Sequence, residues 1–247
     1  MKQVGFDALG VVMGAATFQV LLPQGCNTWG KFGVARTSGD LFYAQFQDTI
    51  ERVWSEASRH LLDSARKAGA HGVAGVRATQ SWLPGSSPVL QVQMVGSAVH
   101  VSGVAALRHP FASLLSIDDT LKLLLRGWVP TGVGVGVASV HVHAGAIRNS
   151  TWRRPFSNVE VELATRAMQV ARETAEYRLR RSPGLNTADG VVGTNVVLSK
   201  TSEQCYTGTG LRIDAQITGT GVTRFGRPTA PIDAVVRLTK GAPDANV

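Results

Sequence analysis

Two histidines at alternate positions of an apolar segment are the residues best suited to chemistry. His141 and His143 stand in a Val-His-Val-His motif, and residues two apart in an extended strand project to one face. Neutral imidazoles are good ligands for zinc and related transition metals, but two ligands leave a site incomplete, so neighbouring chains would complete it. An ordinary polar strand face or a subunit contact is the favoured alternative, because the matching segment of an internal repeat has Gln19 and Leu21 there.

The other histidines and the cysteines fit structural roles better than metal binding. His71 follows a glycine at the end of an amphipathic segment, where a polar side chain closes a helix end or meets another subunit. His60 and His100 fit solvent-facing or hydrogen-bonded positions. Cys26 and Cys205 each lack a second cysteine at metal-binding spacing, so buried or idle thiols are the better interpretation.

No motif for a known class of catalysis is present. The chain has no Gly-x-Ser-x-Gly elbow. The glycines of the Gly-Val repeat at 132–137 lie within a predicted strand, whereas a dinucleotide fingerprint opens a helix. The adjacent carboxylates Asp118 and Asp119 begin a predicted helix, where the helix dipole favours negative charge. We therefore identify no catalytic or cofactor-binding residue and predict that the chain is not an enzyme.

Composition describes a packed chain with a mild basic excess. Its 247 residues are 44% hydrophobic and 17% charged, with a formal charge of +8. Residues 1–116 carry 9 Lys and Arg against 6 Asp and Glu, and residues 117–247 carry 16 against 11. The arginines between 166 and 181 alternate with glutamates, so a solvated helix face is favoured over a nucleic-acid groove. We predict a cytoplasmic protein, because the two cysteines form no disulfide framework and no apolar stretch reaches membrane-spanning length.

An internal repeat determines the expected architecture. The order small residue, polar residue, Gly, Val, small residue, Gly occurs at 70–75 and again at 188–193, each time after a long amphipathic pattern. In each copy an apolar strand precedes the helix and two apolar strands follow it. The expected strands are 9–20, 73–82 and 89–101 in the first copy and 132–142, 191–200 and 211–225 in the second.

Each long helix is expected to bury one stripe. In the first, apolar residues recur at steps of three and four from Asp40 to Ala68, and Gly69 ends it. The second begins at the capping-box pattern of 157–160 and ends at Pro183. A short helix is expected from Ser116. The first strands are apolar on both faces, which is typical of strands covered on both.

The helix exit Gly69-Ala70-His71-Gly72-Val73 and the strand Gly96-Ser97-Ala98-Val99 resemble the YbjQ-like family, described as heavy-metal-binding domains. The resemblance covers about residues 8–102 and 128–225, as a tandem duplication. The second copy departs from it at Pro183-Gly184 and at 218–222. The resemblance implies a dodecin-like strand-helix-strand-strand fold whose units associate into closed rings, commonly of five. It carries over no catalytic residues.

The predicted fold class is α+β, with two tandem dodecin-like units, each an antiparallel sheet with one long helix packed on a face. The units are 1–104 and 128–226, joined by a helical connector at 105–127 and followed by a strand and frayed tail at 227–247. The open sheets have edges that must be covered, so edge strands are expected to pair between chains.

The predicted function is that of a non-enzymatic, ring-forming homo-oligomer, with a pentameric ring of tandem units favoured. A transition metal or small ligand would bind at subunit contacts, with His141 and His143 as the candidate metal ligands. Two alternatives remain open. One is an oligomeric scaffold that binds nucleic acid or anionic surfaces through the arginine-rich helix, and the other is an enzyme with a site between subunits.

Overall fold

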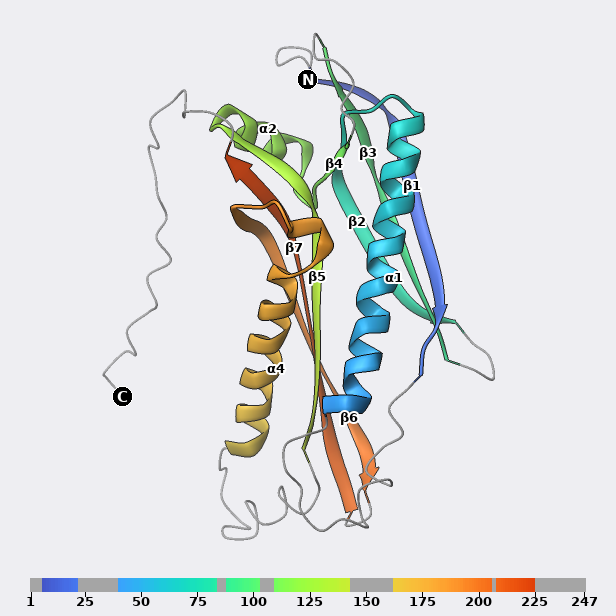
Figure 1. Cartoon of the computed structure of the whole chain (residues 1–247), viewed down its shortest axis with the longest axis vertical. Helices are drawn as coiled ribbons and strands as arrows, with labels where there is room; N and C mark the ends of the chain where they lie inside the picture. The colour runs from blue at the N-terminus through green and yellow to red at the C-terminus, as the bar shows by residue number, and fades with distance from the viewer. Residues whose placement is uncertain are drawn as a thin grey trace, which may run out of the picture.

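The computed structural model describes residues 6–21, 40–83, 88–102, 109–142, 162–205 and 208–224. Two sheets, each with a long helix packed against it, give the α+β fold expected from the sequence (Figure 1). We call β1, α1, β2 and β3 unit one, and β5, α4, β6 and β7 unit two. Among the described residues, no helix is both long and apolar enough to cross a membrane.

Unit one follows the predicted element order. It contains β1 (Phe6–Gln19), α1 (Asp40–Lys67), β2 (Gly72–Leu83) and β3 (Val89–Val101). Gly69 has φ +72, the left-handed conformation that ends a helix without steric cost, as the sequence predicted. β3 pairs antiparallel with both β1 and β2, so the hairpin partner lies in the middle of the sheet.

The connector contributes an element that the sequence did not predict. β4 (Phe111–Ala112) pairs parallel with the start of β2, so the sheet of unit one has four strands in the order β1-β3-β2-β4. Beyond it, the Val76 amide donates to the Ser113 carbonyl and the Gly75 amide to the Leu115 carbonyl. α2 (Ile117–Leu125) follows, where the sequence predicted a short helix, and the hydroxyl of its N-cap residue Ser116 accepts from the Asp119 amide.

Unit two repeats the architecture. It contains β5 (Trp128–Val142), α4 (Glu162–Arg180), β6 (Gly190–Cys205) and β7 (Gly208–Arg224), with strand order β5-β7-β6. A 3-10 turn, Pro183–Leu185, follows α4, so the helix stops where the sequence predicted. The expected capping box at 157–160 lies outside the described residues.

Glycines fix the same close contact in both units. A Cβ atom at Gly14 would lie 2.2 Å from the Leu61 amide nitrogen of α1. A Cβ atom at Gly136 would lie 2.3 Å from the Leu179 amide nitrogen of α4. Each first strand therefore touches the backbone of its helix, which only glycine permits.

A matching bulge strengthens the equivalence of the two units. The β2–β3 register shifts between Ala74 and Arg77, and the β6–β7 register shifts between Val192 and Asn195. Gly75 and Gly193, with φ +65 and +60, stand inside these shifts. The two hairpins therefore superimpose position by position.

Candidate functional site

The structure brings no metal centre together at the predicted histidines. His141 lies one residue before the end of β5, half-buried, opposite Arg212 of β7. His143 lies outside the described residues. Among the residues that the structure describes, no three His, Cys, Asp or Glu side chains are grouped so that they could hold a metal ion. Metal binding by His141 and His143 stays a prediction.

His71, which the sequence predicted to close a helix end or to meet another subunit, lies against the last strand of unit one. Its buried ring lies 4.4 Å from the ring of His100, and its Nδ1 accepts a 2.8 Å hydrogen bond from the Val101 amide. At the equivalent place in unit two, the Asp189 carboxylate accepts from the Arg224 amide at 2.9 Å. In both units a polar side chain at the helix exit therefore binds the end of the last strand.

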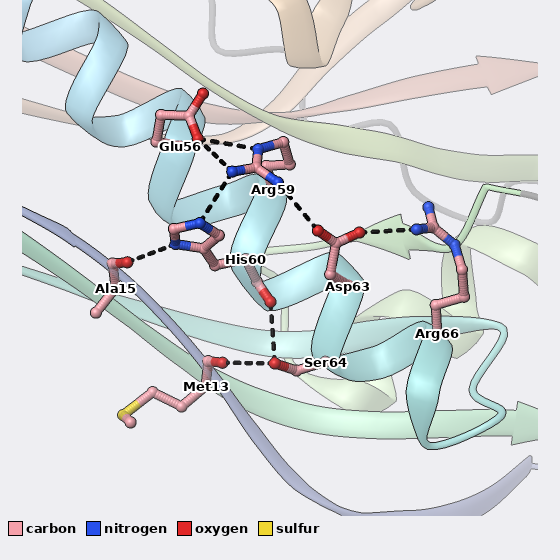
Figure 2. Close-up of polar contacts among 8 residues, drawn as sticks. All are labelled: Met13, Ala15, Glu56, Arg59, His60, Asp63, Ser64 and Arg66. Atoms are coloured by element: carbon pink, nitrogen blue, oxygen red, sulfur yellow. Dashed lines mark hydrogen bonds and ion pairs between the residues drawn. The ribbon is translucent and has the colours of Figure 1, made fainter.

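The outer side of α1 carries a chain of exposed ion pairs (Figure 2). Arg59 bridges Glu56 and Asp63, and Asp63 also binds Arg66. The hydrogen bond from Arg59 to Glu56, with the charge of that carboxylate, raises the pKa of Arg59. These side chains are exposed, so their pairs contribute little to stability.

The same part of α1 holds the edge of β1 and turns Met13 outward. The His60 ring lies 2.7 Å from the Ala15 carbonyl, and the Ser64 hydroxyl donates to the Met13 carbonyl at 3.0 Å. In Figure 2 the Met13 carbonyl points at α1, while the Met13 side chain extends away from that helix. α1 therefore covers the inner face of β1 and leaves Met13 on the outer face.

A second polar cluster joins the two units. Arg178 of α4 donates to Glu51 of α1 through Nε, at 2.7 Å, and through Nη2, and it also binds Asp48. Glu51 accepts in addition from the Val137 amide on the edge of β5, at 3.1 Å. Burial, the largest single effect, lowers the pKa of Arg178, but Glu51 and Asp48 together outweigh it and raise the pKa. Arg178 is therefore a fixed cation between α1 and α4.

Further contacts link unit two to unit one and to the connector. The Gln47 amide donates to the Ser139 carbonyl of β5 at 3.3 Å, and the Leu114 amide donates to the Thr220 hydroxyl of β7 at 2.9 Å. The Arg212 guanidinium lies 5.6 Å from the centre of the Phe46 ring. Figure 1 shows the result, with β5 running between α1 and α4.

The apolar part of this contact is the outer face of β5. Val133 and Val135, on the opposite face from Gly136, are 7% and 4% exposed. Thr218 of β7 lies opposite Val135 and is also buried. These residues, which we call the β5 outer face, adjoin unit one, and Val133 and Val135 belong to the core cluster that includes Ile50 and Val53 of α1. Unit one therefore completes the core of unit two.

The equivalent surface of unit one is open. Val11 and Met13 are 75% and 58% exposed, and Val95 of β3, opposite Met13, is exposed as well. These three residues, which we call the β1 outer face, occupy the positions of Val133, Val135 and Thr218. The expectation of a first strand covered on both faces is confirmed for β5, whereas the part of the chain that the structure describes covers β1 on one face only.

Comparison of the chain with protein-family models, with curated proteins and with solved structures gives no match. The functional assignment therefore depends on the residues of the chain itself. Sequence reasoning missed the cluster around Glu51 and Arg178, because the two residues are 127 positions apart and nothing in either helix marks the other as a partner. The alternation of Val133, Val135 and Val137 with glycines was the available signal for a strand buried on both faces.

Proposed function

We propose that the chain is a self-associating, non-enzymatic protein of YbjQ-like type that assembles into a closed homo-oligomer through the β1 outer face. The observation that carries this is the exposure of Val11 and Met13 at positions whose counterparts, Val133 and Val135, are buried. A contiguous exposed apolar patch on a folded chain marks an interaction surface. Covering it removes apolar side chains from water, which favours association.

The contacts of the three arginines at the C-terminal end of α4 count against nucleic-acid binding through this end of the helix. Arg178 is paired with Glu51 and Asp48, and Arg180 is paired with Glu176. Arg181 donates to the Tyr177 hydroxyl and lies over its ring. Cations already engaged by carboxylates and a ring are poorly placed to neutralise phosphates.

The proposal also includes metal binding at the contacts between subunits. His141 stands on β5, beside the contact with unit one, and a ring would bring further ligands from another chain to it. We expect the purified assembly to contain a stoichiometric transition metal that is lost in His141→Ala, as measured by elemental analysis. Metal-free wild-type protein would rule out this part and leave the assembly proposal standing. The cytoplasmic location stays a prediction from the two isolated cysteines.

Light scattering coupled to size exclusion tests the assembly proposal. We expect wild-type protein at micromolar concentration to have a mass that is a multiple of 26.2 kDa, and Met13→Asp to have the mass of one chain. A carboxylate on the β1 outer face would lose its hydration in the contact. Leu125→Asp is the control, because Leu125 is exposed at the end of α2 and lies outside this face. Wild-type protein at 26.2 kDa would overturn the proposal.

A further inference from the structure

The contact between the two units supplies a template for the contact between chains. Unit one meets β5 through α1, beside the β4 and α2 segments of the connector. The side of unit one formed by α1 and β2 carries Ile50, Val53 and Val76, which share a core cluster with Val133 and Val135. The same side of unit two is formed by α4 and β6. Because the units have matching registers and bulges, each position of the first surface has a counterpart on the second.

The counterpart surface on unit two is open, and the part of it that β6 contributes is apolar. Val196 and Leu198 of β6 are 46% and 47% exposed, and they stand at the positions of Ala78 and Gln80 in β2. In unit one, Trp54 is buried over this region and donates through Nε1 to the Gln80 side chain at 2.8 Å. Unit two has Arg172 in place of Trp54, and Arg172 is exposed. We call Val196 and Leu198, with the adjoining side of α4, the α4–β6 surface.

At two further pairs of equivalent positions, the residue of unit two is covered and its counterpart in unit one is open. A Cβ atom at Gly193 would meet the Leu115 side chain at 2.6 Å, whereas a Cβ atom at Gly75, its counterpart, would meet nothing within 4 Å. Thr220 is fully buried and accepts from the Leu114 amide, whereas its counterpart Ser97 is partly exposed. At these positions unit one is therefore open where unit two is covered by the connector.

We infer that the α4–β6 surface of one copy covers the β1 outer face of the next copy, head to tail, as unit one covers unit two within a chain. The inference rests on the proposed self-association and names its partner surface. Such a contact joins two different surfaces, so it is heterologous. Repeating it from copy to copy gives a closed ring when the successive rotations add up to one full turn. The β1 outer face and the α4–β6 surface are then the two ends of one repeating contact.

The contact between copies differs from its template in charge. Glu51 and Asp48, which bind Arg178 within the chain, have Gln169 and Arg166 as counterparts on α4, and Arg178 has His60 as its counterpart on α1. The ion pairs of the internal contact therefore have no equivalent between copies. Burial of apolar side chains must drive the association, so high salt should leave the assembly intact.

Mixing two dissociated variants tests the head-to-tail pairing. Val11→Asp blocks the β1 outer face, and Val196→Asp blocks the α4–β6 surface. We expect each variant alone to have the mass of one chain, 26.2 kDa, and an equimolar mixture to form a one-to-one pair of twice that mass. In the pair, the intact β1 outer face of one chain meets the intact α4–β6 surface of the other.

The controls separate this inference from self-association itself. Val170→Asp also adds a carboxylate to α4, but its counterpart Arg52 faces solvent in the template, so this variant should assemble as wild type does. Leu198→Asp repeats the block at a second position, and circular dichroism checks that each variant is folded. An assembling wild type whose Val196→Asp and Leu198→Asp variants still assemble would overturn the head-to-tail contact alone. A mixture that stays dissociated would do the same, whereas a single-chain wild type would overturn self-association.

Discussion

Unit one and unit two share one fold, and they differ in what covers the first strand. β1 and β5 touch their helices through Gly14 and Gly136 in the same way, yet the outer face of β5 is buried and that of β1 is exposed. The exposed face, with Val11, Met13 and Val95, is no less apolar than the buried face, with Val133, Val135 and Thr218, so composition does not explain the difference. Packing between the units does, because unit one lies against the outer face of β5, and no further unit lies against β1 among the described residues.

A carboxylate introduced on each outer face should give the largest difference in stability between the two units. Val135→Asp buries a charge without a partner, so we expect a loss of about 4 kcal/mol or more in the free energy of unfolding. Met13→Asp places the same group in water, and we expect a change under about 0.5 kcal/mol. Urea denaturation at low protein concentration, where assembly contributes least, measures both. Equal losses of unfolding free energy in the two variants would contradict the claim that one outer face is buried and the other is exposed.

Substitution of Gly14 or Gly136 by alanine should lower stability by the same amount. This tests the close contact of strand and helix that the two units share. Gly14→Ala places a Cβ atom 2.3 Å from the Ala57 carbonyl oxygen, and Gly136→Ala places one 2.0 Å from the Ala175 carbonyl oxygen. Backbone cannot yield without moving the helix, so we expect each substitution to cost about 3 kcal/mol. Thermal unfolding followed by circular dichroism would show this, and a large cost in only one unit would mean that the two helix contacts are not equivalent.

Arg178 of α4 and His60 of α1 occupy equivalent positions, so substituting each of them compares the polar contacts of the two helices. Arg178→Met removes the partner of Glu51 and Asp48, and we expect a loss of about 1–3 kcal/mol, because Glu51 stays half-buried. His60→Met removes one exposed contact to the Ala15 carbonyl and should cost about 1 kcal/mol or less. Denaturant unfolding of both variants provides the measurement.

The pH dependence of this effect follows from the raised pKa of Arg178. Burial alone would lower that pKa, and Glu51 and Asp48 outweigh it. A group with a raised folded-state pKa contributes its stability fully below its unfolded pKa and loses it as pH rises through the folded value. For arginine this loss falls at strongly alkaline pH, so the cost of Arg178→Met should be constant between neutral and mildly alkaline pH. A cost that fades across that window would contradict the assignment.

Substitution of the bulge glycines should give a small difference in stability between the two units. Gly75→Ala and Gly193→Ala both force a residue with Cβ into positive φ, which costs about 1 kcal/mol. At Gly193 the added carbon also presses on the flexible end of Leu115, so we expect a further cost of about 1 kcal/mol there. Equal costs, measured by urea denaturation, would mean that Leu115 moves aside freely.

Local signals predicted the elements well. The apolar stripe from Asp40 to Ala68 corresponds to α1 at Asp40–Lys67, and Gly69 ends the helix as expected. β4 was missed because its two residues carry no periodicity and exist as a strand only through their pairing with Gly72 and Val73. Short elements of this kind are defined by tertiary contacts rather than by their own sequence.

The candidate interface was predictable only in part. Apolar residues on both faces of the first strands indicated that both faces need cover, and the duplication indicated two equivalent units. Which face is covered within the chain depends on how unit one packs on unit two, through pairs such as Glu51 and Arg178. Such placement is set by side chains far apart in sequence, so only the structure shows that the β1 outer face is the open one.

The mass of the wild-type chain in solution tests the central claim most directly. In sedimentation velocity across a micromolar concentration series, we expect one discrete species whose mass is an integer multiple, two or greater, of 26.2 kDa. A single species at 26.2 kDa at every concentration would leave the β1 outer face permanently in water and would contradict the claim.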